Sequence, residues 1–423
     1  MALSGALGTG CGSDDDVSSR GDAGFFDAGE GDGGTRDATM EDGTPDAGLG
    51  DPLYLLIGAV FTPDGATGYV FPSPDIDGDV EVDLTRTLEI PAAGGGAFAV
   101  PDPPTGQVFI GSGESPVIER YGVDADGVFT LEDRISLMPV GWSSIGTTSG
   151  ITVISPTKAY VFDSTTLTGV EFNPTTMTLV DDFSLSGFEA EEGFSPEFAS
   201  SVVDGNRILV NVRYFTDSPL TATETRLAVL DTTDNSITYD TQTNCANLLF
   251  SVVTDTAIYF SPHANQAYFF ADELSDNSPC AVRVLRGASA YDDDFRLDLN
   301  ALVEGSAGPL VPGSGTSAYV LRYDETTGGP IGPGSAFLPG WRAIEVDLDG
   351  EARVGEVAAF PLTTGAGVGF QVPVEGVMRS YTAIPQFGDA GIESTLLFDV
   401  TDPMNVTQAF EAAGFLVSAS RVR

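Results

Sequence analysis

Arginine and aromatic side chains recur together along the chain and could bind an anionic or catechol-like ligand. Arginine supplies planar hydrogen-bond donors, and aromatic rings supply a face for stacking or for a cation. The alternative interpretation is that each arginine pairs with one of the many carboxylates while each aromatic ring packs into the core. The candidate ligand-binding residues are Trp142, Arg213, Tyr214, Arg322, Tyr323, Trp341 and Arg379.

Histidine chemistry is restricted by number, because His263 is the only histidine among 423 residues. A Ser-His-Asp or Cys-His arrangement needs a histidine placed beside its nucleophile, and metal or haem sites built on several histidines are excluded. His263 stands in the string SPHANQ, between two apolar runs. We therefore expect it in a surface turn with no catalytic role.

The string PDIDGDVEVD places carboxylates at alternate positions, as the first half of a calcium loop does. Asp75, Asp77 and Asp79 are the candidate ligands. The closing bidentate glutamate of such a loop is missing at the usual spacing, and alternation along a strand would send neighbours to opposite faces. A turn followed by an acidic strand is the favoured interpretation, and no cofactor is expected.

Composition argues against nucleic-acid binding and against a membrane-spanning helix. The formal net charge is −44, from 62 acidic and 18 basic residues. Such a surface repels phosphate backbones, which argues against binding to nucleic acid. Hydrophobic residues make up 42% of the chain, with 51 glycines and 26 prolines, as expected for many short strands joined by turns. No apolar stretch is long enough to span a membrane as a helix.

The elements that would position these residues are predicted by a repeat. Phe61–Phe71, FTPDGATGYVF, reads as a strand, a turn with Pro, Asp and Gly, and a second strand. The pattern recurs about every fifty residues, the spacing of four-stranded propeller blades. Its other copies are AVPDPPTGQVFIGS from Ala99, TVISPTKAYVFDS from Thr152, SVVDGNRILVNV from Ser201, YFSPHANQAYFFA from Tyr259, LVPGSGTSAYVLRY from Leu310 and FQVPVEGVMRSYTA from Phe370.

A second hairpin with an Asn/Asp-containing polar turn follows most copies, as in RLAVLDTTDNSITYDTQ and RAIEVDLDGEARVGEV. Together the two hairpins resemble the YVTN-type β-propeller repeat. The resemblance implies an all-β, seven-bladed β-propeller over residues 51–423, with the first and last strands closing the ring in one blade or in adjoining blades. Two stacked β-sandwiches are the alternative, disfavoured because they would show no seven-fold recurrence.

Propeller geometry sorts the loops onto two faces. The turns within the repeated hairpins would occupy one face, including the turn of FTPDGATGYVF. The longer connections between hairpins and between blades would occupy the other, and long loops on a rigid scaffold commonly carry binding function. The candidate arginines and aromatics fall in or beside those connections, as a basic and aromatic rim.

The two cysteines of the body, Cys245 and Cys280, are predicted in neighbouring connections of the fifth blade on that same face. A disulfide is expected there, since two thiols alone do not complete a zinc site.

The N-terminal segment reads as a sorting signal and a tether. Residues 1–11, MALSGALGTGC, resemble the lipobox of bacterial lipoproteins, with Gly10 before Cys11, and the resemblance implies lipidation of Cys11. Residues 12–50 are rich in Asp, Gly, Ala, Thr and Ser, a composition with too little apolar surface to offset the entropy of ordering. We expect a disordered acidic tether.

Taken with the propeller, these features predict a non-enzymatic, lipid-anchored, monomeric protein of the cell envelope that binds a small ligand or a protein partner. The chain is similar to propeller lipoproteins of myxobacterial type, and this resemblance implies a ferric siderophore as one possible ligand. A calcium-assisted hydrolase of the lactonase kind and a purely structural surface module are the alternatives.

Overall fold

The computed structural model describes residues 51–62, 65–77, 84–91, 96–101, 103–145, 150–216, 222–388 and 391–423. The predicted lipidation at Cys11, the predicted tether 12–50 and the candidate ligand Asp79 lie outside these residues. In the described part of the chain, no helix is both long and apolar enough to cross a membrane.

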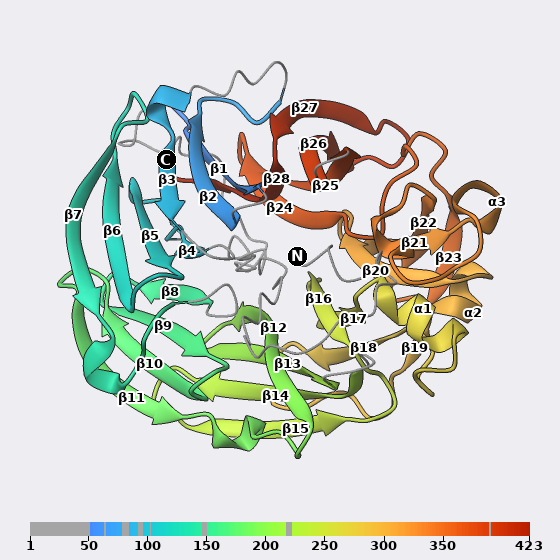
Figure 1. The fold of residues 1–423 in the computed structure, drawn as a ribbon, viewed down its shortest axis with the longest axis horizontal. Coiled ribbons are helices and arrows are strands. Elements are labelled where there is room, and N and C mark those ends of the chain that lie inside the picture. The colour runs from blue at the N-terminus through green and yellow to red at the C-terminus, as the bar shows by residue number, and fades with distance from the viewer. Residues whose placement is uncertain are drawn as a thin grey trace, which may run out of the picture.

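Seven four-stranded antiparallel sheets are arranged as blades around a central axis (Figure 1). The fold is a seven-bladed β-propeller, so the predicted fold class is confirmed. Glycine, proline and aspartate at the turns and β-branched or aromatic residues in the runs account for the short strands.

Each blade runs from an innermost strand near the axis to an outermost strand at the rim. In that order, blade 1 holds β28 (Phe415–Arg421), β1 (Tyr54–Thr62), β2 (Gly65–Ser73) and β3 (Leu88–Pro91). Blade 2 holds β4 (Gly96–Ala99), β5 (Gln107–Ser112), β6 (Val117–Val123) and β7 (Phe129–Ser136). Blade 3 holds β8 (Ile151–Ser155), β9 (Lys158–Asp163), β10 (Thr168–Asn173) and β11 (Thr178–Ser184). Blade 4 holds β12 (Phe194–Asp204), β13 (Arg207–Thr216), β14 (Ala222–Asp231) and β15 (Ile237–Gln242).

Blade 5 holds β16 (Leu248–Val253), β17 (Ala257–Pro262), β18 (Cys280–Leu285) and β19 (Leu297–Asp298). Blade 6 holds β20 (Ala307–Pro312), β21 (Ser317–Tyr323), β22 (Trp341–Asp347) and β23 (Ala352–Glu356). Blade 7 holds β24 (Val368–Val374), β25 (Val377–Gly388), β26 (Gly391–Asp399) and β27 (Thr407–Ala413). Among the described residues, the helices are α1 (Asn265–Ala271), α2 (Leu299–Val303) and α3 (Glu325–Gly328), with 3-10 turns at Leu84–Arg86, Met138–Val140, Ser186–Phe188 and Ser335–Phe337.

The ring closes within blade 1, where the last strand of the chain, β28, pairs antiparallel with the first, β1. Tyr54 faces Arg421 across this pairing, and Leu53 and Arg423 exchange backbone hydrogen bonds. Closure removes an exposed sheet edge that could otherwise template aggregation. The prediction that the terminal strands share a blade or adjoin is confirmed.

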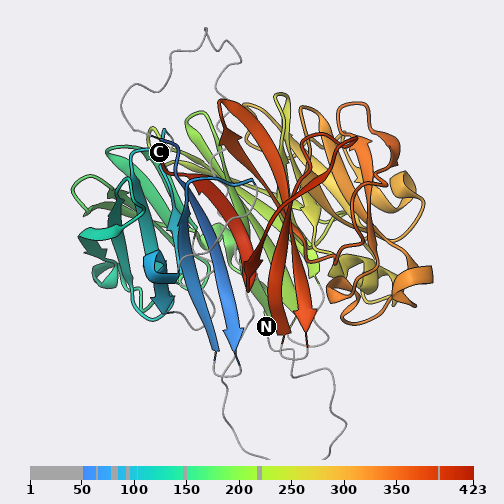
Figure 2. The same ribbon diagram turned by 90° about the horizontal axis from the view of Figure 1, so that it is seen from above.

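This closure corrects the placement of the first repeat. Because β28 is the innermost strand of blade 1, the β1–β2 hairpin is the middle pair of its blade, whereas β4–β5 and the corresponding hairpins of the later blades are inner pairs. The end of the hairpin, where Thr62 pairs with Gly65, therefore lies on the face opposite to the one expected. In Figure 2 it lies at the lower edge of the disc, while the C-terminus lies at the upper edge.

The fifth repeat also differs from its expected placement. SPHANQ is not a hairpin turn: β17 ends at Pro262 and α1 begins at Asn265. The real inner hairpin joins β16 to β17 through Thr254–Thr256, a turn without glycine or proline. Glycine and proline are absent at the true turn, whereas proline and asparagine stand just before and at the start of a short helix, which explains the error.

Fully buried tyrosines at equivalent positions of four repeats tie blades 3, 5, 6 and 7 to the blade that follows each. Tyr160, Tyr259, Tyr319 and Tyr381 are all 0% exposed. Their hydroxyls donate to the outer turn of the following blade: to Asn235 Oδ1 (2.7 Å), Asp349 Oδ1 (3.0 Å), the Val400 carbonyl (2.6 Å) and Asp77 Oδ1 (3.0 Å), respectively. We call these four residues the tyrosine belt. The tyrosine of the YVTN-like motif is thus a structural clamp between blades.

Candidate functional site

The two faces of the propeller differ in what their loops do. The short-turn face carries the turns between the first and second strands of blades 2 to 7, and the connections between the third and fourth strands of each blade. The long-loop face carries the connections within blades between the second and third strands, and the connections from blade to blade. Its longest described segments are 185–193, 263–279, 324–340 and 357–367.

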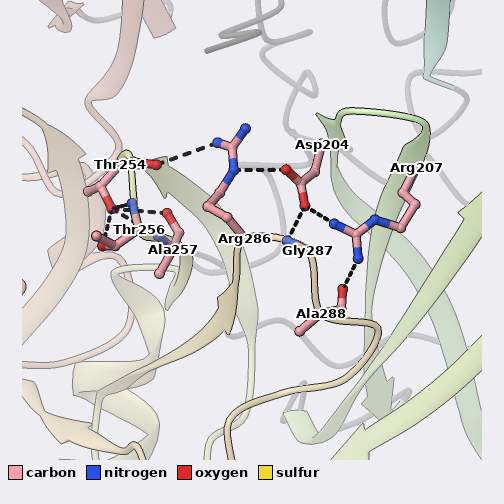
Figure 3. Close-up of polar contacts among 8 residues, drawn as sticks. All are labelled: Asp204, Arg207, Thr254, Thr256, Ala257, Arg286, Gly287 and Ala288. Carbon is pink, nitrogen blue, oxygen red and sulfur yellow. Dashed lines mark hydrogen bonds and ion pairs between the residues drawn. The ribbon is translucent and has the colours of Figure 1, made fainter. Parts of the chain in front are cut away.

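Blade 4 lacks the tyrosine of the belt and is joined to blade 5 by charge instead (Figure 3). Asp204, buried on the short-turn face, accepts from Arg286 Nε (2.8 Å) and the Gly287 amide (2.9 Å), and also from Arg207. Arg207 Nη1 then donates to the Ala288 carbonyl (2.7 Å). Two guanidinium groups neutralise one buried carboxylate, as burial of a charge requires. The turns of the short-turn face therefore contribute ion pairs and hydrogen bonds that hold neighbouring blades together.

Arg213 lies at the long-loop end of β13 and is 5% exposed. Its guanidinium forms a two-point contact with Glu197, with Nε 3.1 Å from Oε2 and Nη2 2.7 Å from Oε1. Nη1 donates to Asn247 Oδ1 at 2.8 Å, and the guanidinium carbon lies 4.5 Å from the Phe215 ring centre. All three nitrogens are engaged inside the protein, as the alternative interpretation of the rim expected.

His263 is buried, with 1% exposure, which corrects the expected surface turn. Its ring stacks on Phe250 with centroids 6.2 Å apart, and its Nδ1 accepts the Asn265 amide at 3.1 Å. Burial, with a smaller contribution from nearby Arg213, lowers the pKa of His263 to about 3. The imidazole is therefore neutral at physiological pH and carries its proton on Nε2.

The aromatic candidates are buried, and each braces a long loop through its polar atom. The exposed fractions are 2% for Trp142, 1% for Tyr214, 4% for Tyr323 and 0% for Trp341. Their hydrogen bonds run from Trp142 Nε1 to Thr168 Oγ1 (2.6 Å), from Tyr214 Oη to the Phe188 carbonyl (2.9 Å), from Tyr323 Oη to the Gly328 carbonyl (2.7 Å) and from Trp341 Nε1 to the Ser335 carbonyl (2.9 Å). These rings hold the loops in place, whereas a stacking platform would need an open face.

Close packing around Trp341 requires glycine at two neighbouring positions. A Cβ at Gly308 would lie 2.8 Å from an indole carbon, and one at Gly365 would lie 2.7 Å from another. The backbone of Trp341 also pairs with that of Thr363, so Trp341 anchors segment 357–367 as well as its own loop. GAGVGF near Gly365, the most glycine-rich string of this region, is thus shaped by the tryptophan beside it.

The remaining two arginines do not complete one rim. Arg322 ends β21 on the long-loop face and pairs with Glu356 at 3.5 Å. Arg379 instead begins β25 on the short-turn face, where it pairs with Asp77 and, at 3.6 Å, with Asp399. The expectation that Arg379 shares a face with Arg213 and Arg322 is wrong, because Arg379 stands near the start of its strand, whereas Arg213 and Arg322 stand near the end of theirs.

Asp75 and Asp77, the two candidate calcium ligands among the described residues, lie in the outer loop of blade 1, on the short-turn face. Asp75 Oδ1 accepts the amides of Ile76 (2.7 Å) and Asp77 (3.0 Å), which shapes a turn. Asp77 bonds to Arg379 and Tyr381 of blade 7. Within the residues that the structure describes, no three His, Cys, Asp or Glu side chains are grouped as a metal site would require. Calcium binding by Asp75, Asp77 and Asp79 as a set stays a prediction.

Cys245 and Cys280 form the predicted disulfide, with Cα atoms 5.7 Å apart. It joins the connection between blades 4 and 5 to the start of β18, and both residues are buried. Asn247, which receives the Arg213 hydrogen bond, follows Cys245 by two residues. The disulfide therefore fixes the backbone that completes the Arg213 contacts.

Replacing both cysteines by serine should lower the free energy of unfolding by about 2–4 kcal/mol, because the unfolded chain loses a cross-link. The two cysteines are 35 positions apart in sequence, which is a substantial loop to release. Urea denaturation of the double variant, beside the wild type with and without reductant, measures the effect. Two titratable thiols in the unreduced wild-type protein would contradict the disulfide.

Glu197 and Asn247 were missed by sequence reasoning, although both contact Arg213. A signal existed for Glu197, since the Asp204–Arg207 turn sets the register of β12 against β13. Counting back from that turn pairs Arg213 with Phe198, and a bulge between Phe198 and Ser200 shifts the partner to Glu197. No comparable signal marks Asn247, which lies in the connection between blades 4 and 5.

Solved structures show similarity at the level of the fold. A hypothetical selenium-binding protein from Sulfolobus tokodaii is 9% identical with a TM-score of 0.52, covering 88% of this chain and 92% of that one. AztD from Citrobacter koseri in its apo form is 11% identical with a TM-score of 0.41, covering 88% and 98%. No protein-family model and no curated protein matches the sequence. At these identities the similarity shows the β-propeller fold alone.

Proposed function

We propose that this chain is a non-enzymatic, lipid-anchored propeller of the cell envelope whose long-loop face binds a partner protein. The observation that carries the proposal is that the loops of the two faces make different kinds of contact. On the short-turn face, Asp204 and the acceptors of the tyrosine belt hold neighbouring blades together. The long-loop face carries segments that do not repeat, and these segments are held rigid by a disulfide and by buried aromatic rings.

A rigid, irregular surface on a symmetric scaffold is the usual form of a binding site. Trp341 fixes segments 324–340 and 357–367, Tyr214 fixes 185–193, and the disulfide fixes 243–247 against β18. Order of this kind lowers the entropy lost on association. The fold would close without such long segments, so their bracing supports a role in recognition.

A protein partner is favoured over a small anionic or siderophore-like ligand. The arginines and aromatic rings suited to such a ligand are engaged with Glu197, Glu356 and backbone carbonyls. Rebuilding them as a small-ligand site would break those contacts.

An envelope location is supported by the disulfide, because disulfides persist in oxidising compartments. The lipobox-like sequence before Cys11 and the net charge of −44 agree with an exported, anchored protein.

Site-specific photo-crosslinking in cells that produce the protein tests this function. A photoreactive residue is placed singly at Glu114, Asp276 or Glu325 on the long-loop face, and at Asp255 or Glu375 on the short-turn face, all of which are exposed. We expect defined protein adducts from long-loop positions alone. Adducts confined to the short-turn face, or no adduct from any of the five positions, would overturn the proposal.

A further inference from the structure

We infer that an apolar patch on blades 5 to 7 of the long-loop face docks a cationic, apolar segment of the partner protein. The inference rests on the proposed function and names the chemistry of its partner. The patch consists of Phe270, Phe337, Leu338, Leu362 and Phe387.

Exposure of large apolar side chains is the first observation. Phe270 is 39% exposed, Leu338 48% and Leu362 40%. Phe337 and Phe387 are half-buried, with ring centroids 6.0 Å apart. Single exposed apolar residues are ordinary, but clustering of several on one surface marks an interaction site.

The members come from four separate segments that the structure brings together. Helix α1, which carries Phe270, packs against the 3-10 turn Ser335–Phe337. The Gly340 amide donates to the Thr363 carbonyl at 3.1 Å, which ties the segment that carries Leu362 to the loop that carries Leu338. Phe387 joins from the long-loop end of β25 through its contact with Phe337. In Figure 1, α1 lies beside the loops of blade 6.

Carboxylates adjoin the patch and determine the charge of the partner. Asp272, Glu273 and Asp276 follow α1 directly, and Glu325 begins α3 in the same loop as Leu338; all four are exposed. An apolar centre with an acidic margin is complementary to a segment that carries apolar anchors between lysines or arginines.

Charge also decides against two other occupants. A second copy of this chain would bring two molecules of net charge −44 together at their acidic margins. An anionic lipid surface would be repelled by the same carboxylates. Both remain measurable outcomes of the test below.

The probe is a fluorescent 18-residue amphipathic helical peptide of leucine and lysine, and a peptide of the same charge with serine in place of leucine measures charge attraction alone. Binding is followed by anisotropy in 0.15 M salt. The patch variant is Phe270→Ser, Leu338→Ser and Leu362→Ser together. The matched control is Val128→Ser, Val377→Ser and Met404→Ser, whose side chains are 48%, 59% and 88% exposed on the short-turn face.

We expect the patch variant to bind the leucine–lysine peptide at least tenfold more weakly than the wild type and the control variant, with no change for the serine–lysine peptide. Neutralising Asp272, Glu273 and Asp276 as amides should weaken binding more than neutralising Asp126, Asp255 and Glu351 of the short-turn face. Thermal unfolding checks that all variants fold.

Equal affinity of wild type and patch variant would overturn the inference, as would dimerisation or binding to anionic vesicles that the patch variant abolishes. Failure of the inference is distinguishable from failure of the proposed function. Crosslinks from Glu114, but none from Asp276 or Glu325, would keep a partner on the long-loop face and place it away from the patch.

Discussion

Replacing Glu197 by alanine should lower the free energy of unfolding by about 3–5 kcal/mol, because breaking a buried ion pair leaves its partner charged and desolvated. Arg213 is 5% exposed and would retain only Asn247 as a hydrogen-bond acceptor. The effect should appear as a lower midpoint of urea denaturation with an unchanged slope.

Two further variants distinguish the cost of leaving a buried charge unpaired from the cost of lost side-chain packing. Replacing Glu197 by leucine and Arg213 by methionine together removes both charges, and we expect a smaller loss than from Glu197→Ala alone. Arg353→Ala removes one partner of an exposed 2.8 Å pair with Glu304 and should cost less than about 1 kcal/mol. A loss of that small size for Glu197→Ala would show that water solvates Arg213, contrary to the structure.

Raising the pH above 10 should unfold the protein through its tyrosine belt. Burial, followed by the hydrogen bond to Asp349, raises the pKa of Tyr259 from 10.0 to about 12. Burial likewise raises the pKa values of Tyr160, Tyr319 and Tyr381 well above 10. A phenol with a higher pKa in the folded state binds its proton more tightly there, so its contribution is complete below pH 10 and is lost as pH rises towards the folded pKa.

The expected size is large because several groups act together. A difference of one pKa unit corresponds to about 1.4 kcal/mol, so Tyr259 alone accounts for on the order of 2–3 kcal/mol between pH 10 and 12. Tyrosinate absorbance at alkaline pH and circular dichroism should therefore change in one step. Between pH 10 and 12, the free energy of unfolding of Tyr259→Phe should fall by less than that of the wild type. Below pH 10 it should be lower than that of the wild type by about 1 kcal/mol, because one hydrogen bond is missing. Belt tyrosines that ionise near pH 10 in a protein with native circular dichroism would contradict the prediction.

The tyrosine belt shows which features of the fold a repeated local pattern can predict and which it cannot. The recurring string of two apolar runs and a turn predicted the blades, since strand propensity and turn chemistry act over a few residues. That the tyrosine hydroxyl reaches the next blade was not predictable, because no pattern within one repeat specifies which outer turn packs against it.

Strand direction decided which candidates belong together. Arg322-Tyr323 and Arg379 with Tyr381 look alike as strings, but Arg322 ends its strand and Arg379 begins one. The faces of a propeller alternate with each strand, so an error of one strand moves a residue to the opposite side of the molecule. The first repeat was displaced in the same way, because β28 supplies the inner strand of blade 1 from the other end of the chain.

By itself, the sequence determined the seven-bladed architecture, the closure of the ring by its terminal strands, and the disulfide, because each depends on repeated local signals or on a pair of cysteines. Only the tertiary structure decided how the candidate site is used. Whether Arg213 faces a ligand or Glu197 depends on a bulge in β12 and on Asn247 from the adjoining blade. Whether Phe270 and Leu362 share a surface depends on how segments nearly a hundred residues apart pack, and such contacts are determined by the assembled ring rather than by any one stretch of chain.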